Sequence, residues 1–508
     1  MSIRSNSRTP YIEAARSRRS FITSSLATAA LPMIEKANLI AGQTKPALIA
    51  TDPLRPQYHL LPMANWMNDP NGPIYWNGQY HLFYQYNPHA AVWGDMHWAH
   101  AVSPDMIHWR HMPLALSPTS QGPDQDGCFS GSTVVRNGVP TILYTGVAST
   151  TPEEATLRDG KHNFRESQCI ATSASPDLRS WVKSPRPVIQ RPPHGVAITG
   201  FRDPCVWWSG TSWFMLLGSG FAKVGGCVLL YRSSDLHHWE YLHPLLSGTW
   251  NGLRGVDPVD SGEMWECPDF FPLGSKHVLL YSTERKVYWT VGELDSQSMI
   301  FHPERKGLLD TGAFYAPKTM LDREGNRILW GWIPETRPER DSVQAGWAGL
   351  ISLPRVLSLQ IDNSLGMQPI SSLDTLRMIS SVEGPLSFDQ FCGEAIIRFA
   401  RSGQDLSVAL GSANRVYLAV HFRSSFPHSI FIDGVELPIA KSQEELRQLH
   451  IFMDASVIEI FVDKSLAHTK RVYELDLDSS ETRVSVSGHR DAAVWQLRPI
   501  SPDRLTTN

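Results

Sequence analysis

The run Ser103-Pro104-Asp105-Met106-Ile107-His108-Trp109 recurs twice in this chain of 508 residues. It returns as Ser175-Pro176-Asp177-Leu178-Arg179-Ser180-Trp181 and as Ser233-Ser234-Asp235-Leu236-His237-His238-Trp239. The starts are about 60–70 residues apart (175 − 103 and 233 − 175), a period that suits a repeated four-stranded sheet. At this period, the roughly 300 residues between 50 and 355 hold about five sheets. The sequence therefore predicts an all-β fold in which residues 50–355 form a five-bladed β-propeller.

Local signals within this region agree with short strands joined by tight turns. Asn77-Gly78 and Asn137-Gly138 lie between apolar runs and predict β-hairpins. Strand candidates are rich in apolar and aromatic residues, and they include Thr141–Tyr144, Trp213–Leu217, Cys227–Tyr231 and His277–Tyr281. Helical periodicity is scarce throughout.

The C-terminal part has a different pattern. Val416–Phe422 alternates with a period of two, and Asp433-Gly434 marks a turn between two further short runs. Alternating short strands of this kind predict a β-sandwich over residues 379–500. Residues 356–378, which include the polar run Asp362-Asn363-Ser364, are interpreted as a linker between the two domains.

Composition excludes several classes of function. The 46 Lys and Arg residues nearly balance the 50 Asp and Glu residues, which gives no electrostatic reason to expect nucleic acid or an anionic membrane as partner. The six cysteines lack CxxC or CxxH spacing, which argues against a zinc site, a redox motif or a disulfide framework. Four neighbouring histidines (His97, His100, His108 and His111) show no metal-ligand pattern either. We expect no metal ion and no cofactor.

The N-terminus carries an export pattern. Ser17-Arg18-Arg19-Ser20-Phe21-Ile22 is a twin-arginine run, and a modestly apolar stretch follows it to Ile34. We interpret residues 1–45 as a bacterial Tat signal peptide with a flexible N-terminus, which predicts an exported protein, periplasmic or extracellular. A basic tail without a signal function is the alternative. The stretch is too short and too polar for a stable membrane span, so no membrane partner is expected after signal removal.

Three runs centred on acidic residues follow one another along the predicted propeller. They are Trp66-Met67-Asn68-Asp69-Pro70-Asn71-Gly72-Pro73, Phe201-Arg202-Asp203-Pro204 and Trp265-Glu266-Cys267-Pro268-Asp269. Each one alone has an ordinary structural interpretation. The first reads as an Asx-rich turn that leads into a strand, the second as a surface turn, and the third as a strand with a paired structural acid.

Taken together and in this order, the three acidic runs resemble glycoside hydrolase family 32, the invertases, inulinases and levanases. Further matching blocks are His59 with Pro62, Leu82–Pro88, Trp93–Trp98, Cys128–Ser132, Tyr315–Pro317, Ile328–Trp332, Gly346–Gly349, Leu353–Arg355 and Phe452–Phe461. The resemblance covers about His59 to Asp463. It implies a five-bladed propeller with its site in the central cavity, a β-sandwich behind it, and release of fructose from sucrose or fructans.

Cleavage of a glycosidic bond requires a protonated carboxylic acid for the leaving oxygen and, in retaining enzymes, an ionised carboxylate that attacks the anomeric carbon. Asp69 lies among amide side chains and turn N–H groups, which favour its charged form. Glu266 lies between Trp265 and Cys267, an apolar setting that favours the protonated form. The resemblance gives the same roles, with Asp69 as nucleophile and Glu266 as acid/base, and it makes Asp203 the transition-state stabiliser.

The sequence neighbours of the acids carry expectations of their own. Arg202 is expected to keep Asp203 ionised and to hydrogen-bond nearby substrate hydroxyls or carboxylates, Cys267 to pack beneath Glu266, and Asp269 to be either functional or a structural ligand of Arg202. The resemblance implies that Asn68, Gln85, Trp93, Phe129 and Ser130 line the fructosyl subsite, with Trp66, Tyr315 and Trp332 as neighbours.

Three other functions remain open. An inverting propeller glycosidase of the arabinanase type would place its carboxylates about 6.5–9.5 Å apart instead of about 5–5.5 Å. A fructosyltransferase would use the same residues and pass the sugar to another sugar. A sugar-binding protein without catalysis is the third, but all three acids are present. The sequence does not separate sucrose from inulin, levan or short fructans, nor exo from endo action, and it leaves the oligomeric state open.

Overall fold

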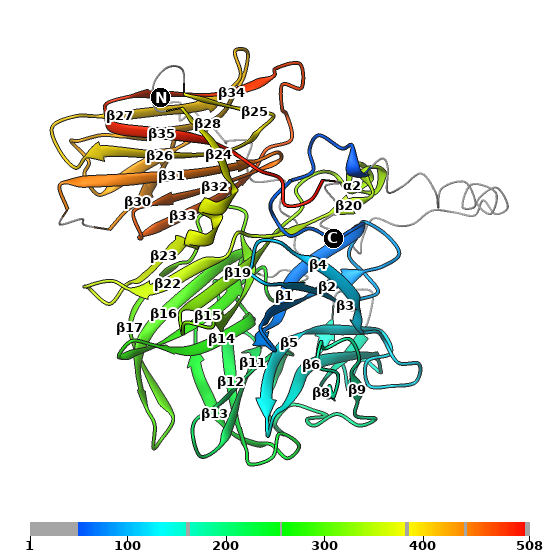
Figure 1. Cartoon of the computed structure of the whole chain (residues 1–508). Coiled ribbons are helices and arrows are strands. Elements are labelled where there is room, and N and C mark those ends of the chain that lie inside the picture. Colours follow the sequence, from blue (N-terminus) through cyan, green and yellow to red (C-terminus); the bar gives the residue numbers. More distant parts are fainter. Residues whose placement is uncertain (1–48, 159–162, 254–256, 382–385, 441–443, 503–508) are drawn as a thin grey trace, which may run out of the picture.

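Two all-β units make up the computed structural model, which describes residues 49–158, 163–253, 257–381, 386–440 and 444–502 (Figure 1). The first 48 residues, and with them the expected signal peptide, lie outside the described residues. In Figure 1 the first unit lies below, in blue to yellow, and the second lies above it, in yellow to red. In the described part, no helix is long and apolar enough to cross a membrane.

Five sheets follow one another along the first unit, and this confirms the predicted five-bladed propeller. The first blade holds β1 (Asn65–Trp76), β2 (Gln79–Asn87), β3 (His97–Ser103) and β4 (Arg110–Leu116). The second holds β5 (Gly127–Arg136), β6 (Val139–Ser149), β7 (Leu157–Arg158), β8 (Asn163–Thr172) and β9 (Val182–Lys183). The third holds β10 (Ile198–Trp208), β11 (Trp213–Phe221), β12 (Gly225–Ser233) and β13 (Glu240–Ser247).

The last two blades complete the set. The fourth holds β14 (Glu266–Leu273), β15 (Lys276–Thr283), β16 (Lys286–Asp295) and β17 (Ile300–Leu308). The fifth holds β18 (Tyr315–Leu321), β19 (Arg327–Ile333), β21 (Leu350–Ile351), β22 (Arg355–Leu359) and β23 (Leu365–Pro369). A short helix, α2 (Glu339–Ala345), and the strand β20 (Trp347–Ala348) lie between β19 and β21.

The first strand of each blade lies at the centre of the propeller. The strands β1, β5, β10, β14 and β18 each contact the next one in this order, and β18 contacts β1, so the five form a closed ring. β20 strengthens the closure, because it lies within the fifth-blade segment in sequence yet pairs in parallel with Asn65 and Trp66 of the first blade. Residues on the ring that lie far apart in the chain are thereby brought around one central axis.

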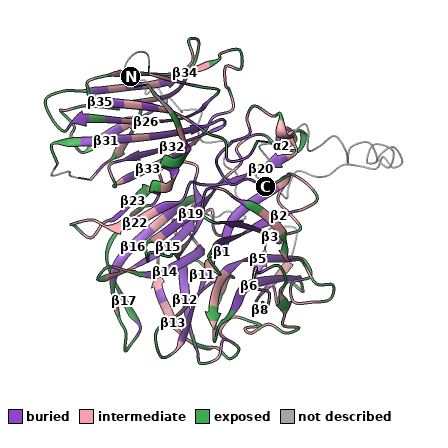
Figure 2. Cartoon of the chain, in the orientation of Figure 1, coloured by how far each residue is buried: buried purple, intermediate pink, exposed green. Residues whose placement is uncertain are grey.

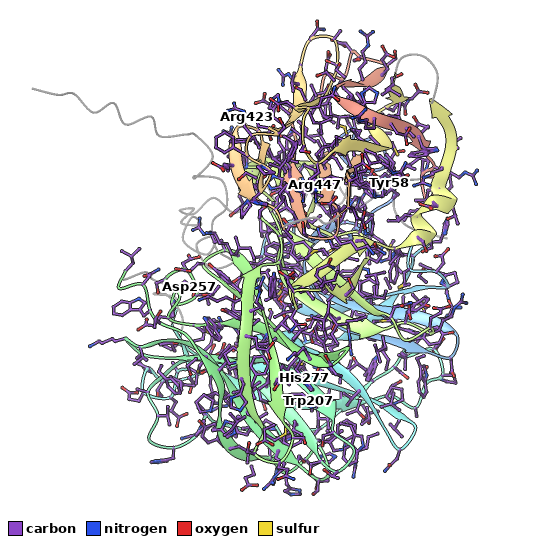
Figure 3. All side chains as sticks on the ribbon, turned by 90° about the vertical axis from the view of Figure 1, so that its left-hand side faces the viewer. Tyr58, Trp207, Asp257, His277, Arg423 and Arg447 are labelled. Atoms are coloured by element: carbon purple, nitrogen blue, oxygen red, sulfur yellow. The ribbon has the colours of Figure 1, made fainter. Side chains whose placement is uncertain are left out.

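Apolar side chains fill the spaces between neighbouring blades. Phe270 of the fourth blade, for example, contacts Trp207 of the third at 5.3 Å between ring centroids and stacks on His277 at 5.3 Å. Trp207 and His277 are labelled in Figure 3. Buried residues run along the strands of both units, whereas exposed residues lie mainly at turns and sheet edges (Figure 2). Because the blades share these apolar layers, the positions of their inner strands are fixed relative to one another.

The recurring run that predicted the blades forms their outer turns. In the first blade the Asp105 carboxylate accepts hydrogen bonds from the N–H groups of Ile107 and His108, and this Asx turn joins β3 to β4. Asp235 closes the corresponding turn between β12 and β13. The predicted hairpin at Asn77-Gly78 is also present, with φ of 48° and 77°, as the tight turn of a hairpin requires.

The predicted β-sandwich is confirmed as two six-stranded sheets. One sheet holds β24 (Arg377–Ser381), β26 (Cys392–Ala400), β31 (Leu446–Asp454), β32 (Val457–Val462), β33 (Leu466–Arg471) and β35 (His489–Leu497). The other holds β25 (Ser387–Asp389), β27 (Leu406–Gly411), β28 (Val416–Phe422), β29 (Ser429–Ile432), β30 (Val435–Pro438) and β34 (Glu481–Ser487). Alternate residues such as Leu406 and Val408 face Ile451 and Ile460 in the shared core, as the period of two predicted.

The linker expected at residues 356–378 differs from the structure. β22 and β23 are outer strands of the fifth blade, and Asp362-Asn363-Ser364 lies in the hairpin turn that joins them. Only the 3₁₀ helix Ser371–Leu376 separates this blade from β24 of the sandwich. A polar run marks a hairpin turn and a linker in the same way, so the sequence pattern did not distinguish them.

A buried network of charges joins the two units. Asp454, at the end of β31, accepts hydrogen bonds from the His59 backbone N–H and from His59 Nδ1 at 2.7 Å. Glu459, on β32, contacts His59 Nε2 at 3.1 Å and Arg355 Nη2 at 2.7 Å. Arg355 also pairs with Asp310 at 2.9 Å. The Phe452–Phe461 block therefore anchors the sandwich to the start of the propeller chain.

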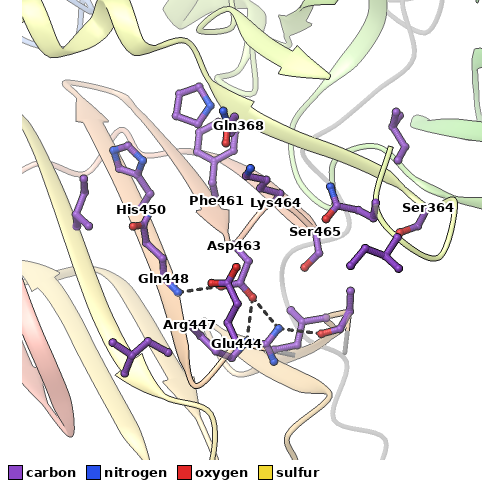
Figure 4. A pocket seen from close by; sticks show the side chains of 18 of the residues that line it. Ser364, Gln368, Glu444, Arg447, Gln448, His450, Phe461, Asp463, Lys464 and Ser465 are labelled. Carbon is purple, nitrogen blue, oxygen red and sulfur yellow. Dashed lines mark hydrogen bonds and ion pairs between the residues drawn. The ribbon is translucent and has the colours of Figure 1, made fainter. Parts of the chain in front are cut away.

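A cleft of about 1490 Å³ lies between the outer strands of the fourth and fifth blades and the sandwich (Figure 4). Charged side chains on its sandwich wall bind each other, as Arg447 does with Asp463 at 2.8 Å. Its propeller wall comes from β16, β17 and the hairpin of β22 and β23, and its other wall comes from the sandwich, so it lies away from the inner strands of the ring.

Candidate active site

The three acids of the sequence analysis all lie on inner strands of the ring. Asp69 is on β1, Asp203 is on β10 and Glu266 is the first residue of β14. Their exposed fractions are 0%, 1% and 4%. Three carboxylates that are 134 and 63 residues apart in the chain (203 − 69 and 266 − 203) thus meet in one buried cluster.

Each inner strand is irregular where it approaches this cluster. Its pairing with the second strand of the blade shifts between Asn68 and Pro70, Phe129 and Gly131, Arg202 and Cys205, Glu266 and Asp269, and Tyr315 and Lys318. Such bulges redirect side chains and are common beside active sites. The segment Asn68–Gly72, which was expected to be a turn, is therefore a bulged part of β1. Bulges and turns favour the same residue types, so the sequence did not distinguish them.

Proline follows the irregular position in four of the five blades, at Pro70, Pro204, Pro268 and Pro317. Proline has no N–H to donate, so it fits where the ladder of hydrogen bonds is interrupted. The residues that precede the last three prolines have φ of 63°, 48° and 50°. The recurrence of proline in four of the five inner strands is a signal in the sequence that would have located four of these five bulges.

Asp69 is surrounded by hydrogen-bond donors. Asn68 Nδ2 donates to Oδ1 at 3.0 Å, and Ser130 Oγ donates to Oδ2 at 2.5 Å. The Cys267 thiol lies 3.4 Å from the same Oδ2. The amide donor is of the kind that the sequence analysis expected around Asp69, whereas the hydroxyl and the thiol come from other blades.

Two further side chains, Trp66 and Gln85, fix these donors in place. Trp66 Nε1 donates to Asn68 Oδ1 at 2.7 Å, and Asn68 Nδ2 also donates to Gln85 Oε1 at 3.1 Å. Gln85 Nε2 in turn donates to Ser130 Oγ at 3.0 Å. Because Ser130 Oγ accepts the hydrogen bond from Gln85, its own proton is free to be donated to Asp69. Trp66, Asn68, Gln85 and Ser130, all expected at the subsite, thus hold the carboxylate in one orientation.

Asp203 lies next to Asp69 across the Cys267 side chain. Its Oδ2 accepts the Cys267 N–H at 2.9 Å and lies 3.4 Å from the Cys267 thiol. The expectation that Cys267 packs beneath Glu266 was wrong. The left-handed backbone at Cys267 turns its side chain towards the other two acids.

Glu266 has a polar environment, in contrast to the apolar one expected. Arg202 donates to its Oε1 from Nε at 3.0 Å and from Nη2 at 2.7 Å, and the Tyr315 hydroxyl donates to Oε2 at 3.0 Å. Trp265 points elsewhere and stacks on Tyr281 at 3.8 Å between ring centroids. Neighbours in sequence lie on opposite faces of a strand, so they did not reveal which groups face Glu266.

Arg202 was expected to serve Asp203, yet its Nε lies 3.9 Å from that carboxylate. Its main partners are Glu266 and Glu166, whose Oε1 accepts Nη1 at 2.8 Å. Burial acts to lower the pKa of Arg202, but the carboxylates of Glu266 and Glu166 outweigh it and hold this pKa above its ordinary value. The guanidinium thus keeps its charge at the centre of the propeller.

Glu166 was not identified from the sequence. It lies on β8, the third strand of the second blade, where a glutamate is expected to face solvent. The signal was its place directly before Ser167-Gln168-Cys169-Ile170, a run without any other charge. A charged residue at the start of a buried strand requires a partner, and here that partner comes from the next blade.

Both parts of the chain match family models. Residues 59–369 match the Glycosyl hydrolases family 32 N-terminal domain, and residues 389–497 match the Glycosyl hydrolases family 32 C terminal. The chain belongs to glycoside hydrolase family 32.

Relatives in this family agree over most of the chain. Sucrose-6-phosphate hydrolase of Escherichia coli is 36% identical over 489 residues, which cover 87% of this chain and 94% of the relative. A Bombyx mori GH32 beta-fructofuranosidase, solved as a mutant in complex with sucrose, has a TM-score of 0.75 at 30% identity, covering 92% of this chain and 98% of that one. Fructan 1-exohydrolase IIa of Cichorium intybus has a TM-score of 0.74 at 26% identity, covering 88% and 98%.

Aromatic rings surround the acids of this family 32 protein. Trp332 lies 5.8 Å from Trp66 and 6.5 Å from Tyr315, measured between ring centroids. Trp93, which is half-buried, meets Phe129 edge to face at 5.9 Å. The aromatic residues that the resemblance places at the subsite thus form one cluster of three rings and one pair. They come from three blades and from the loop after β2.

Asp269 has a structural position. Its Oδ2 accepts the Thr319 N–H at 2.8 Å, and Cys205 Sγ lies 3.5 Å from Oδ1. The buried Lys318 donates to the Pro268 carbonyl at 2.8 Å. Asp269 therefore helps to join the fourth blade to its neighbours and is not the ligand of Arg202 that one interpretation had made it. Among the described residues, no group of three or more His, Cys, Asp or Glu residues is arranged to hold a metal ion.

Proposed function

We propose that the protein is a retaining β-fructofuranosidase that hydrolyses the terminal fructosyl bond of sucrose or of fructans. The observation that carries this proposal is the contrast between two carboxylates in one buried cluster. Asp69 accepts hydrogen bonds from fixed donors, whereas Glu266 is bound by Arg202 and Tyr315 on the adjacent part of the ring. A pair of carboxylates with different surroundings can divide the roles of nucleophile and acid between them.

The first step would form an ester. The Asp69 carboxylate attacks the anomeric carbon of the fructosyl unit, and the bond to the leaving oxygen breaks. The electron pair of that bond stays with the leaving oxygen, which takes the proton of Glu266. Asp203, which is held by the Cys267 N–H, would hydrogen-bond the fructose hydroxyls as positive charge develops on the ring.

The second step would reverse the roles. A water oxygen attacks the anomeric carbon, and Glu266 takes the proton of that water. The ester bond to Asp69 breaks, and its electrons return to the carboxylate. Two inversions give fructose with its original anomeric configuration.

Sucrose is the first substrate to test. The Bombyx mori relative was solved with sucrose bound, the Escherichia coli relative is named for sucrose 6-phosphate, and the Cichorium intybus relative for fructan. Inulin, levan and short fructans belong in the same panel, with product chromatography to detect transfer to sugar. An arabinanase-type reaction has no support from these relatives.

The decisive experiment follows the anomeric form of the first-formed fructose by NMR. Retention supports the proposal, and inversion refutes the double displacement. The Glu266→Gln variant should lose most activity on sucrose but less on a fructoside with an activated leaving group, and azide should restore part of its second step. Equal losses on both substrates without an azide effect would remove Glu266 from the acid/base role.

We also propose that the protein is exported. The support is the Ser17–Ile22 twin-arginine run in the sequence.

A further inference from the structure

The structure raises an electrostatic problem at Glu266. The proposed reaction requires this residue to carry a proton, yet two N–H groups of Arg202 bind its Oε1 at 3.0 and 2.7 Å. A guanidinium at hydrogen-bond distance favours the ionised form of a carboxyl group. Protonation of Glu266 would also leave a buried cation without its main counter-ion, which is costly. A second negative group beside Arg202 would relieve both effects.

Glu166 is that second group. It is fully buried, with an exposed fraction of 0%, and its Oε1 accepts Arg202 Nη1 at 2.8 Å. Its Oε2 accepts the Phe201 N–H at 2.8 Å and the Thr156 hydroxyl at 2.9 Å. These bonds use both oxygens of Glu166 and fix its side chain on the side of Arg202 opposite to Glu266, away from the reacting acids.

We propose that Glu166 is a positioning residue that acts as the permanent counter-ion of Arg202. It keeps the guanidinium paired while Glu266 gains and loses its proton, so that Arg202 orients the acid without forcing it to remain ionised. This inference rests on the proposed function, because it requires Glu266 to be the acid/base.

Other ionisable groups near this network come from several elements. Those that face Arg202 or the acids around it are Asp203 and Cys267 on the same ring, Asp69 on β1, Tyr315 on β18 and Asp257 in the segment before β14. On the Nη1 side of the guanidinium, the fully buried carboxylate of Glu166 accepts a hydrogen bond at 2.8 Å. Removal of the Glu166 charge should therefore favour the ionised form of Glu266 over its protonated form.

The test is the pH profile of sucrose hydrolysis by the Glu166→Gln variant. The alkaline limb of kcat/KM reports the acid that must be protonated. We expect this limb to move to lower pH by about one unit or more, the size of effect that one neighbouring charge produces. At neutral pH kcat should fall about tenfold, KM should change little, and a fructoside with an activated leaving group should lose less.

Two companion variants separate charge from packing. Glu166→Asp keeps the charge, so the midpoint of its alkaline limb should lie within about half a pH unit of the wild-type value. Glu394→Gln is the matched control, because Glu394 is another buried glutamate, bound by Arg377 and His450 in the sandwich. It should lower thermal stability and leave the pH profile unchanged.

The outcomes are distinct. A soluble Glu166→Gln variant whose alkaline limb coincides with that of the wild type overturns the inference, and so does an equal shift in Glu394→Gln. If Glu166→Gln fails to fold, Thr156→Val takes its place, since it removes one donor that holds Glu166, and a smaller shift in the same direction is required. Loss of sucrose hydrolysis in the wild type itself would instead refute the proposed function.

Discussion

The junction between the propeller and the sandwich should weaken as pH rises, because of His59. Burial acts to lower the pKa of His59, but hydrogen bonds to Asp454 and Glu459 outweigh it and raise this pKa from 6.5 to about 9. A pKa that is higher in the folded state contributes stability fully below pH 6.5, and this stability is lost as pH rises through about 9. The difference between about 9 and 6.5, at about 1.4 kcal/mol per pH unit, amounts to about 3 kcal/mol.

The perturbation is His59→Gln, which keeps an amide donor for one carboxylate but carries no charge at any pH. Urea unfolding of the wild type and the variant at pH 6, 7.5 and 9.5 gives the difference in unfolding free energy at each pH. We expect a difference of about 3 kcal/mol at pH 6, a smaller one at pH 7.5 and convergence of the two proteins at pH 9.5 and above.

His108→Gln is the matched control. His108 also binds a carboxylate, that of Asp105 at 2.7 Å, but both side chains are more than one-third exposed. Solvent screens such a pair, so this variant should track the wild type at every pH. A constant difference between the wild type and His59→Gln from pH 6 to 9.5, or one that grows with pH, would refute the assignment of a charged His59 to this junction.

Four further predictions concern the site, the chain terminus and metals. Asp69→Asn should fold normally but lose about a thousandfold or more in kcat on sucrose, and near-normal turnover would rule out its role as nucleophile. Gly226→Ala should lower both stability and activity, because a Cβ there would lie 2.1 Å from the Trp265 ring beside the acid, and unchanged melting would contradict this packing. A paired change of Arg18 and Arg19 to Lys should trap the precursor in the cytoplasm of a host with a Tat pathway, and unchanged secretion would count against export by that route. Dialysis against EDTA should leave activity intact, and a loss that one divalent metal restores without refolding would show a required metal site.

The sequence alone indicated the architecture because local patterns carry it. The Ser-Asp-Trp run recurs once per blade in the first three blades, where its Asp or Ser side chain accepts a backbone N–H in the outer turn. Asn-Gly pairs located hairpins, since both residues tolerate positive φ. The alternation after residue 379 likewise predicted a sandwich with one buried face per sheet.

The candidate acids and some of their partners were also visible in the sequence, whereas the pairing between them was not. Asp69, Asp203 and Glu266 lie in short runs that resemble those of family 32. The groups that bind them come from other blades, as in the Cys267 contact with Asp69 across 198 residues. The apolar setting expected for Glu266 failed for this reason, since Arg202 reaches it from the preceding blade.

The tertiary structure therefore decided the electrostatics of the site. Arg202 lies 36 residues from Glu166 and 64 from Glu266, and it binds both because the apolar layers between blades fix the inner strands in one ring. A strand pattern predicts which residues of the strand are buried, but not which residues of the next blade they contact. The free energy of a buried ionised group depends on the groups that surround it in space. For this chain, only the closure of the propeller determines those groups.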